Sequence, residues 1–316
     1  MTAPARPSLP RRIARAFGLV LLVLLVGLAT QLRRDLPLAD VLPRYGAPPS
    51  RFVEVEGLRV HYRDEGSGPP IVLLHGTSSS LHTWDGWVTA MASHRRVVRL
   101  DMPGFGLTGP APDRDYSVAR YARFLGAFLD RLGIPKADLA GNSLGGRVAL
   151  AFALEHPERV RKLVLLDPSG LSGQTPPTIF RLAKIPGLGP VLSRVTPRAL
   201  LRKNLEEVYG DPTKVTEPLV DRYYAMTLRA GNRDALIDRL TRAHDPFLDD
   251  RLAEVRTPTL LLWGEADRWI PLSFGQRFHR GIRGSELVTY PGVGHVPMEE
   301  SPAATARDAE AFLARP

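Results

Sequence analysis

Short runs of consecutive apolar residues recur along most of this chain, and amphipathic helical patterns lie between them. A short run of this kind is typical of a strand buried on both faces of a sheet. The runs are Ile71–Leu74, Val97–Leu100, Asp138–Ala140, Leu163–Leu166, Leu260–Trp263 and Glu286–Tyr290, and the helical patterns are Val118–Leu132, Leu144–Glu155 and Ala303–Leu313. Strands that alternate with helices predict an α/β fold, in which a mostly parallel sheet carries helices on both faces.

Two regions of the chain depart from this alternation. Residues 52–56 and 58–63 alternate apolar and polar side chains about Gly57, which predicts an antiparallel hairpin. Residues 171–250 contain no strand-like run, and their prolines and glycines are followed by helical segments. We interpret this interval as an α-helical cap inserted after the sixth strand, between a first core part at 51–170 and a second at 251–316.

The positive charge of the chain is concentrated near its N-terminus. The formal net charge is +9 at pH 7, but eight arginines among the first 51 residues face only Asp35 and Asp40, so this stretch carries 8 − 2 = +6. The remaining +3 does not indicate a nucleic-acid partner. The chain has no cysteine, which excludes disulfides, thiolate nucleophiles, cysteine-based zinc sites and iron–sulfur clusters.

An uncharged apolar segment, AFGLVLLVLLVGLAT, occupies residues 16–30 after four arginines. We predict that residues 1–35 form a single-pass membrane anchor, with the globular domain outside the cytoplasm because arginine is denser before the segment than after it. Fifteen helical residues rise about 22 Å, less than the roughly 30 Å hydrocarbon core, so flanking arginines would have to reach the interface. Secretion after signal cleavage is the alternative.

Prolines dominate the next stretch, residues 36–50, which contains Pro37, Pro43, Pro48 and Pro49. Because proline interrupts helices, we interpret this stretch as a non-helical linker, with the globular domain beginning near Arg51.

A Gly-x-Ser-x-Gly pattern, Gly141-Asn142-Ser143-Leu144-Gly145, stands between a predicted strand and a predicted helix. Such a turn holds serine on a strained strand-to-helix corner, where small glycines avoid clashes and the helix N-terminus favours a developing negative charge. We therefore predict that Ser143 is a nucleophile.

A nucleophilic serine needs a base and an acid that orients the base. His295 follows the last predicted strand in a glycine-rich loop, and Asp267 follows the strand before it. The chain order Ser143, Asp267, His295 is the one expected for this kind of turn. Glu265 and Asp167 are rivals for the acid, and Asp167 also ends a strand.

The reaction of a serine nucleophile also requires donors for the oxyanion. His75-Gly76-Thr77-Ser78 follows the first buried strand. We predict that the backbone N–H groups of Thr77 and Leu144 are these donors, and that His75 has a structural role.

These motifs resemble the α/β-hydrolase superfamily from about Phe52 to the C-terminus, and the Asp101–Gly106 segment, DMPGFG, is similar to a common active-site loop of that superfamily. The resemblance implies an eight-stranded, mostly parallel sheet, a Ser-His-Asp triad, no cofactor and no metal, and a variable cap. Serine at position 143 disfavours the members that use an aspartate nucleophile. The motifs are similar to those of esterases and of hydrolases that cleave carbon–carbon bonds in ring-cleavage products, although Val296 replaces the aromatic residue that often follows the histidine in the latter.

We therefore expect a serine hydrolase that cleaves a carboxylic ester or related acyl bond of a small, lipophilic substrate through an acyl-enzyme on Ser143. A carbon–carbon bond hydrolase is the alternative enzyme, and a serine perhydrolase a more distant one. A non-catalytic ligand-binding protein of the same fold is the alternative from another class. Six aromatic residues are candidates for the pocket lining or for the core: Trp84, Trp87, Trp269, Phe274, Tyr223 and Tyr224.

Overall fold

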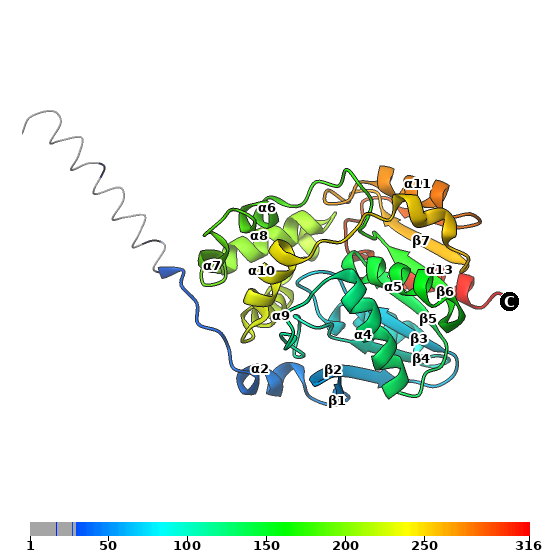
Figure 1. Ribbon diagram of the computed structural model, residues 1–316, viewed down its shortest axis with the longest axis horizontal. Coiled ribbons are helices and arrows are strands. Elements are labelled where there is room, and N and C mark those ends of the chain that lie inside the picture. The colour runs from blue at the N-terminus through cyan, green and yellow to red at the C-terminus, as the bar shows by residue number, and fades with distance from the viewer. Residues whose placement is uncertain (1–16, 18–26, 28–29) are drawn as a thin grey trace, which may run out of the picture.

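An eight-stranded sheet forms the centre of the protein (Figure 1). The structure is a computed structural model that describes residues 17, 27 and 30–316. The strands are β1 (Arg51–Val55), β2 (Leu58–Glu65), β3 (Pro70–Leu74), β4 (Arg96–Leu100), β5 (Ala137–Asn142), β6 (Val160–Leu166), β7 (Thr259–Gly264) and β8 (Glu286–Tyr290). The predicted α/β fold and its eight-stranded sheet are confirmed.

The strand order is β1-β2-β4-β3-β5-β6-β7-β8, and the sheet is mostly parallel. Only β1–β2 and β2–β4 pair antiparallel among the described strands. The hairpin predicted around Gly57 joins β1 to β2, and its two turn residues, Glu56 and Gly57, have φ values of 49° and 76°. Positive φ at both positions matches the right-handed twist of the flanking strands.

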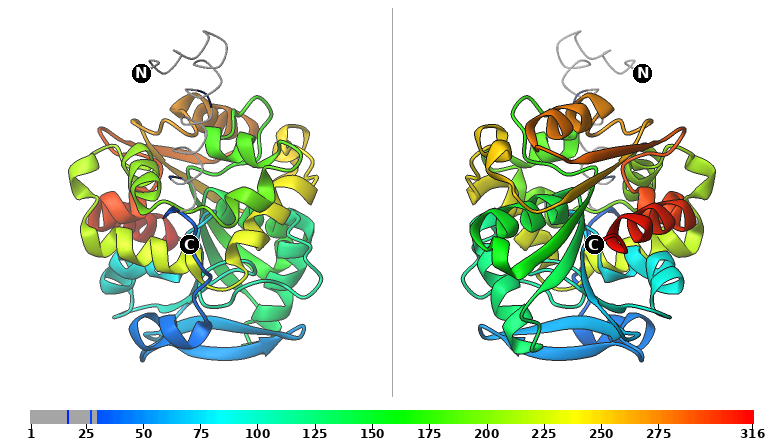
Figure 2. Two further views of the ribbon diagram at one scale, coloured as in Figure 1. Left: turned by 90° about the vertical axis from the view of Figure 1, so that its left-hand side faces the viewer. Right: turned by 90° about the vertical axis from the view of Figure 1, so that its right-hand side faces the viewer.

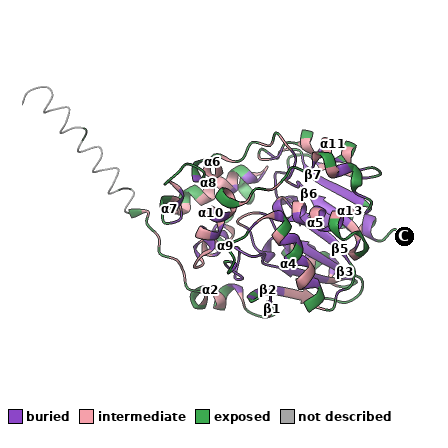
Figure 3. Ribbon diagram, viewed as in Figure 1, coloured by how far each residue is buried: buried purple, intermediate pink, exposed green. Residues whose placement is uncertain are grey.

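Helices cover both faces of the sheet, as Figure 2 shows. The strand β3 explains why, because Val72 and Leu74 belong to one hydrophobic cluster and Ile71 and Leu73 to the other. A strand that is apolar at every position needs a cover on each side, and the inner strands β3 to β7 are buried along most of their length (Figure 3). The helices of the core are α3 (Asp85–Met91), α4 (Val118–Arg131), α5 (Leu144–Glu155), α11 (Leu272–Gly281), α12 (Pro297–Glu300) and α13 (Pro302–Leu313).

Five helices lie between β6 and β7 and group together at one end of the sheet (Figure 1). They are α6 (Thr178–Ala183), α7 (Gly189–Leu192), α8 (Arg198–Val208), α9 (Glu217–Leu228) and α10 (Asn232–Arg242). We call these helices and their connections the cap. The described residues also form short 3-10 helices: η1 (Leu81–Trp84), η2 (Pro157–Arg159), η3 (Pro212–Lys214) and η4 (Asp249–Glu254).

The interpretation of residues 36–50 as non-helical is wrong, because Leu38–Tyr45 form helix α2 with Pro43 inside it. Proline removes one helical hydrogen bond, but burial offsets this loss. Val41 and Tyr45 of α2 are buried against Leu107 of the core and Met226 of the cap. The helix is therefore stabilised by tertiary packing that the local sequence does not reveal.

The apolar segment of the predicted membrane anchor, residues 16–30, lies outside the described residues except at Phe17, Gly27 and Thr30. In the part of the chain that the structure describes, we find no helix with the length and apolar character needed to cross a bilayer. The anchor therefore stays a prediction.

Candidate active site

Ser143 stands at the corner between β5, which ends at Asn142, and α5, which begins at Leu144. Its backbone has φ 52° and ψ −114°, a strained conformation for a residue with a side chain. The corner is tight: a Cβ on Gly145 would lie 2.2 Å from a carbonyl oxygen at the end of β3. Glycine is required at this position, and it allows the strained serine to be presented at the end of the sheet.

The His295 ring is held by Asp267 through a bond of 2.6 Å from Nδ1 to Oδ2. The other oxygen of Asp267 accepts the backbone N–H groups of Trp269, at 2.7 Å, and Ile270, at 2.9 Å. Both His295 and Asp267 are buried. This arrangement places the proton on Nδ1 and leaves Nε2 as the basic nitrogen.

Ser143 and His295 line the same cavity. No hydrogen bond joins the two side chains within the described residues, so the catalytic contact between them is not formed in this state. Such contacts are often long without substrate and tighten when it binds. Because Asp267 holds the His295 ring and His295 shares a cavity with Ser143, these three residues form the candidate triad.

Two further side chains fix the histidine loop, and the sequence analysis missed both. The Asn142 amide donates to the carbonyl oxygens of Leu166, at 3.1 Å, and His295, at 2.9 Å. One oxygen of Glu300 accepts the N–H of Gly294 at 2.7 Å, and the other accepts the N–H of Gly210 in the cap at 2.9 Å. Only the position of Asn142 beside the nucleophile provides a signal in the sequence.

Asp167, the rival acid, lies beside Asp267 rather than in place of it. Candidate ligand atoms of Asp167, Asp267 and His295 all lie within 4.8 Å of one another, a spacing that would suit a metal ion. However, Asp267 already holds His295, and one oxygen of Asp167 accepts the N–H of Gly264 at 3.0 Å, while its other oxygen makes no hydrogen bond among the described residues. Burial, together with the negative charge of Asp267, raises the pKa of Asp167 well above its ordinary value. The raised pKa favours the neutral form of Asp167.

This pair predicts a pH-dependent stability effect for Asp167→Asn. Between the ordinary carboxyl pKa and the raised one, folded Asp167 keeps a proton that the unfolded chain releases, so wild-type stability falls as the pH rises above about 4. An asparagine does not titrate and therefore avoids this cost. We expect its melting temperature to exceed that of wild type by a few degrees at pH 8 and by much less at pH 4. A gain that is equal at both pH values would show that Asp167 is ionised.

The predicted oxyanion donors, Thr77 and Leu144, follow β3 and Ser143 respectively. Neither N–H is used in a hydrogen bond among the described residues, and Thr77 lines the cavity. His75 is buried and both of its ring nitrogens are occupied: Nδ1 donates to the Gly76 carbonyl at 2.7 Å, and Nε2 accepts the Met102 N–H at 3.0 Å. Burial lowers the pKa of His75, so the ring is neutral and structural.

The cavity above Ser143 has a volume of about 610 Å³ and continues beneath the cap. Its walls are mainly apolar side chains of three cap helices: Ile179, Phe180 and Ala183 of α6, Leu200, Leu201 and Leu205 of α8, and Leu236, Ile237 and Leu240 of α10. Of the six candidate aromatic residues, Trp269 and Tyr223 line this cavity. Trp84 and Trp87 are fully buried core residues.

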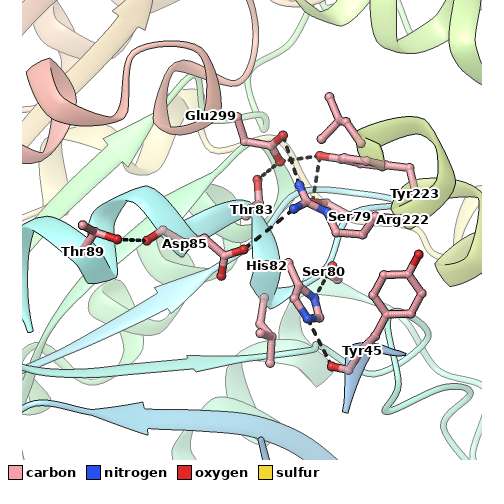
Figure 4. Close-up of polar contacts among 12 residues, drawn as sticks. Tyr45, Ser79, Ser80, His82, Thr83, Asp85, Thr89, Arg222, Tyr223 and Glu299 are labelled. Carbon is pink, nitrogen blue, oxygen red and sulfur yellow. Dashed lines mark hydrogen bonds and ion pairs between the residues drawn. The ribbon is translucent and has the colours of Figure 1, made fainter. Parts of the chain in front are cut away.

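A buried carboxylate ties the cap to the core close to the histidine loop (Figure 4). Glu299 of α12 accepts the hydroxyl of Tyr223 at 2.7 Å and that of Tyr209 at 2.5 Å, and it also accepts the hydroxyl of Thr83. The Tyr223 hydroxyl lies 3.2 Å from that of Ser79, beside the predicted oxyanion loop. The cap is therefore fixed to the same loops that carry the candidate catalytic groups.

The family model of the alpha/beta hydrolase fold matches residues 69–302 of this chain. The match spans both core parts and the cap, and it includes every residue of the candidate triad. The chain therefore belongs to the alpha/beta hydrolase fold family.

Several known proteins are similar to this chain in sequence or in structure. A 2-hydroxy-6-oxo-2,4-heptadienoate hydrolase of Pseudomonas putida is 32% identical over 78% of this chain and 89% of its own. A 2-hydroxy-6-oxononadienedioate/2-hydroxy-6-oxononatrienedioate hydrolase of Paraburkholderia phymatum is 35% identical over 82% of this chain and 93% of its own. Among solved structures, a membrane phospholipase A is 29% identical, with a TM-score of 0.70, and covers 95% of this chain and 97% of its own.

Proposed function

We propose that this protein is a serine esterase that hydrolyses a small ester with a lipophilic acyl group. The observation that carries this proposal is the mainly apolar cavity of about 610 Å³ that opens onto Ser143 and His295. A cavity of this size accommodates a substrate of several hundred daltons, and its walls favour an apolar chain. The name of one similar solved structure, a membrane phospholipase A, also favours a lipophilic substrate.

In the proposed reaction, His295 takes the proton of the Ser143 hydroxyl as the oxygen attacks the acyl carbon. The N–H groups of Thr77 and Leu144 stabilise the oxyanion, and His295 protonates the departing alcohol. Water, activated by the same histidine, then attacks the acyl-enzyme and releases the acid. Asp267 orients the ring and stabilises its charged form.

Hydrolysis of a carbon–carbon bond in a dienoate is the second candidate, and the curated relatives favour it more directly than they favour ester cleavage. Two of them are named as hydrolases of 2-hydroxy-6-oxo dienoic acids and are at least 32% identical to this chain. The residue after the histidine is Val296 instead of the aromatic residue often found in such enzymes. The same triad could cleave either bond, because both reactions transfer an acyl group to water.

A substrate panel tests this proposal against its alternative. We expect the purified protein to hydrolyse 4-nitrophenyl esters with acyl chains of four to eight carbons at a kcat/KM at least about 100-fold above that for a 2-hydroxy-6-oxo dienoic acid, because the cavity walls stabilise apolar chains. The reverse order would establish the carbon–carbon hydrolase. Absence of turnover, together with no labelling of Ser143 by an organophosphonate, would indicate a ligand-binding protein.

We also propose that residues 1–35 anchor the protein to a membrane, with the catalytic domain outside the cytoplasm. The proposal rests on the apolar segment at residues 16–30 and its flanking arginines. Cell fractionation followed by protease treatment of intact cells tests it. Recovery of the full-length chain from the soluble cytoplasmic fraction would contradict it.

A further inference from the structure

A group of polar side chains in the wall of the cavity is not explained by the hydrolysis of a neutral ester. Arg147 of α5, Arg239 of α10 and Asp245 line the cavity together with Gln174, which follows β6. Two guanidinium groups share the single carboxylate: Arg239 lies 2.6 Å and Arg147 lies 4.0 Å from Asp245 Oδ2. The three charged groups therefore leave one positive charge in excess beside the candidate nucleophile.

Two donors in this wall also lack an acceptor within the described part of the chain. Arg147 Nε and Gln174 Nε2 are buried and make no hydrogen bond. Arg147 Nη2 donates to the Pro246 carbonyl at 2.7 Å, and the Gln174 oxygen accepts the Gly170 N–H at 3.0 Å. A buried donor without an acceptor is costly, so an acceptor atom supplied by a ligand would stabilise this wall.

The two side chains that carry these donors lie beside the same residue, Gly170. A Cβ on Gly170 would be 3.2 Å from Arg147 Nε, and Gln174 is bonded to the Gly170 backbone. Arg147 also follows Ser143 by four residues, which is one turn of α5 and a rise of about 6 Å. Helical side chains lean toward the N-terminus, so the Arg147 side chain leans toward the turn that carries Ser143.

We propose that Arg147, Gln174 and Arg239 form a subsite for an anionic oxygen group, a carboxylate or a phosphate, of the substrate hydrolysed at Ser143. This inference rests on the proposed hydrolase function and names a substrate class for it: an apolar acyl compound that carries an anionic group a few bonds from the scissile carbonyl. Arg147 and Gln174 donate to the anion, Arg239 contributes charge, and Asp245 holds the two arginines in place.

Matched substrates test the subsite in the full-length protein. The carboxylate arm compares the mono-4-nitrophenyl ester of hexanedioic acid with 4-nitrophenyl hexanoate, and the phosphate arm compares dihexanoyl phosphatidate with dihexanoylglycerol. We expect a higher kcat/KM for the anionic member of at least one pair. Arg147→Met should lower that value about 10- to 100-fold, the scale of a hydrogen bond to a charged group, and should change the neutral member less than about 3-fold.

Two further variants control for charge and folding. Arg181 is an exposed residue of α6 that does not line the cavity, so Arg181→Met removes one positive charge without removing either buried donor and should keep the anionic preference. Gln174→Met should reduce the preference for the anionic substrate without changing any charge. This variant tests the subsite even if Arg147→Met fails to fold. Equal losses on the neutral and anionic members, or no anionic preference in wild type, would overturn the proposal.

A binding measurement separates this proposal from the proposed hydrolase function. Calorimetry on Ser143→Ala compares hexyl phosphate and monomethyl hexanedioate with hexanol, and it requires no turnover. We expect the better anion to bind at least about 10-fold more tightly than hexanol, and Arg147→Met in the same background to remove this difference. If anions and hexanol bind equally, ordered water satisfies the two donors and the subsite does not exist, whether or not the protein hydrolyses esters.

Discussion

Ser143→Ala will leave the protein folded and reduce its hydrolytic kcat by roughly 10³- to 10⁶-fold, the largest effect that we expect of any single substitution. The reason is that the variant has no oxygen to form the acyl-enzyme, while the predicted oxyanion donors and the cavity remain. Removing one hydroxyl from the strained corner leaves no large void. The melting temperature should therefore stay within a few degrees of wild type.

The measurement is hydrolysis of the preferred substrate, with organophosphonate labelling followed by mass spectrometry. Ser93→Ala is a matched control because Ser93 is exposed and its hydroxyl contacts only the neighbouring His94 among the described residues. This control should keep the wild-type rate and the label on Ser143. An unchanged rate in Ser143→Ala would mean that another group performs the chemistry.

Asp267→Asn should lower kcat by about 10⁴-fold, the second of the two large effects. The Asp267 carboxylate accepts a hydrogen bond from the His295 Nδ1–H group at 2.6 Å. An asparagine amide turned toward this nitrogen would favour the tautomer with the proton on Nε2, which cannot act as the base. Because the side chain is nearly isosteric, the loss should appear in kcat more than in the folding of the protein.

Asp167→Asn is the matched comparison, since Asp167 lies in the same buried group but does not bond to His295. We expect its kcat to fall by less than about 10-fold, because the substitution leaves the bond between Asp267 and His295 in place. Steady-state kinetics of the two variants on one substrate decides which carboxylate orients the base. Comparable large losses in both would show that the two carboxyl groups act as one unit.

The local patterns of the chain were sufficient to predict most of the architecture. The apolar runs coincide with strands β3 to β8 to within two residues at most ends, and the turn at Gly57 joins β1 to β2. The reason is that a strand covered on both faces is apolar at nearly every position. A run of consecutive apolar residues therefore identifies it. The strained backbone of Ser143 was likewise predictable, because the glycines around it are adjacent in sequence.

The helix at residues 38–45 was not predictable in the same way. Its proline opposes helix formation locally, and the stabilising contacts come from Leu107 and Met226, which are distant in the chain. The same holds for Asn142 and Glu300, whose partners lie in the histidine loop and, for Glu300, also in the cap.

By itself, the sequence of this protein determined the fold class and the positions of the candidate nucleophile, base and acid, since each is encoded by neighbouring residues. Only the tertiary structure decided that Asp167 lies buried beside Asp267 with a raised pKa, and that Arg147 and Gln174 lie beside each other at Gly170 in the cavity wall. The physical reason is that charge state and hydrogen-bond satisfaction depend on burial and on groups brought together across the fold.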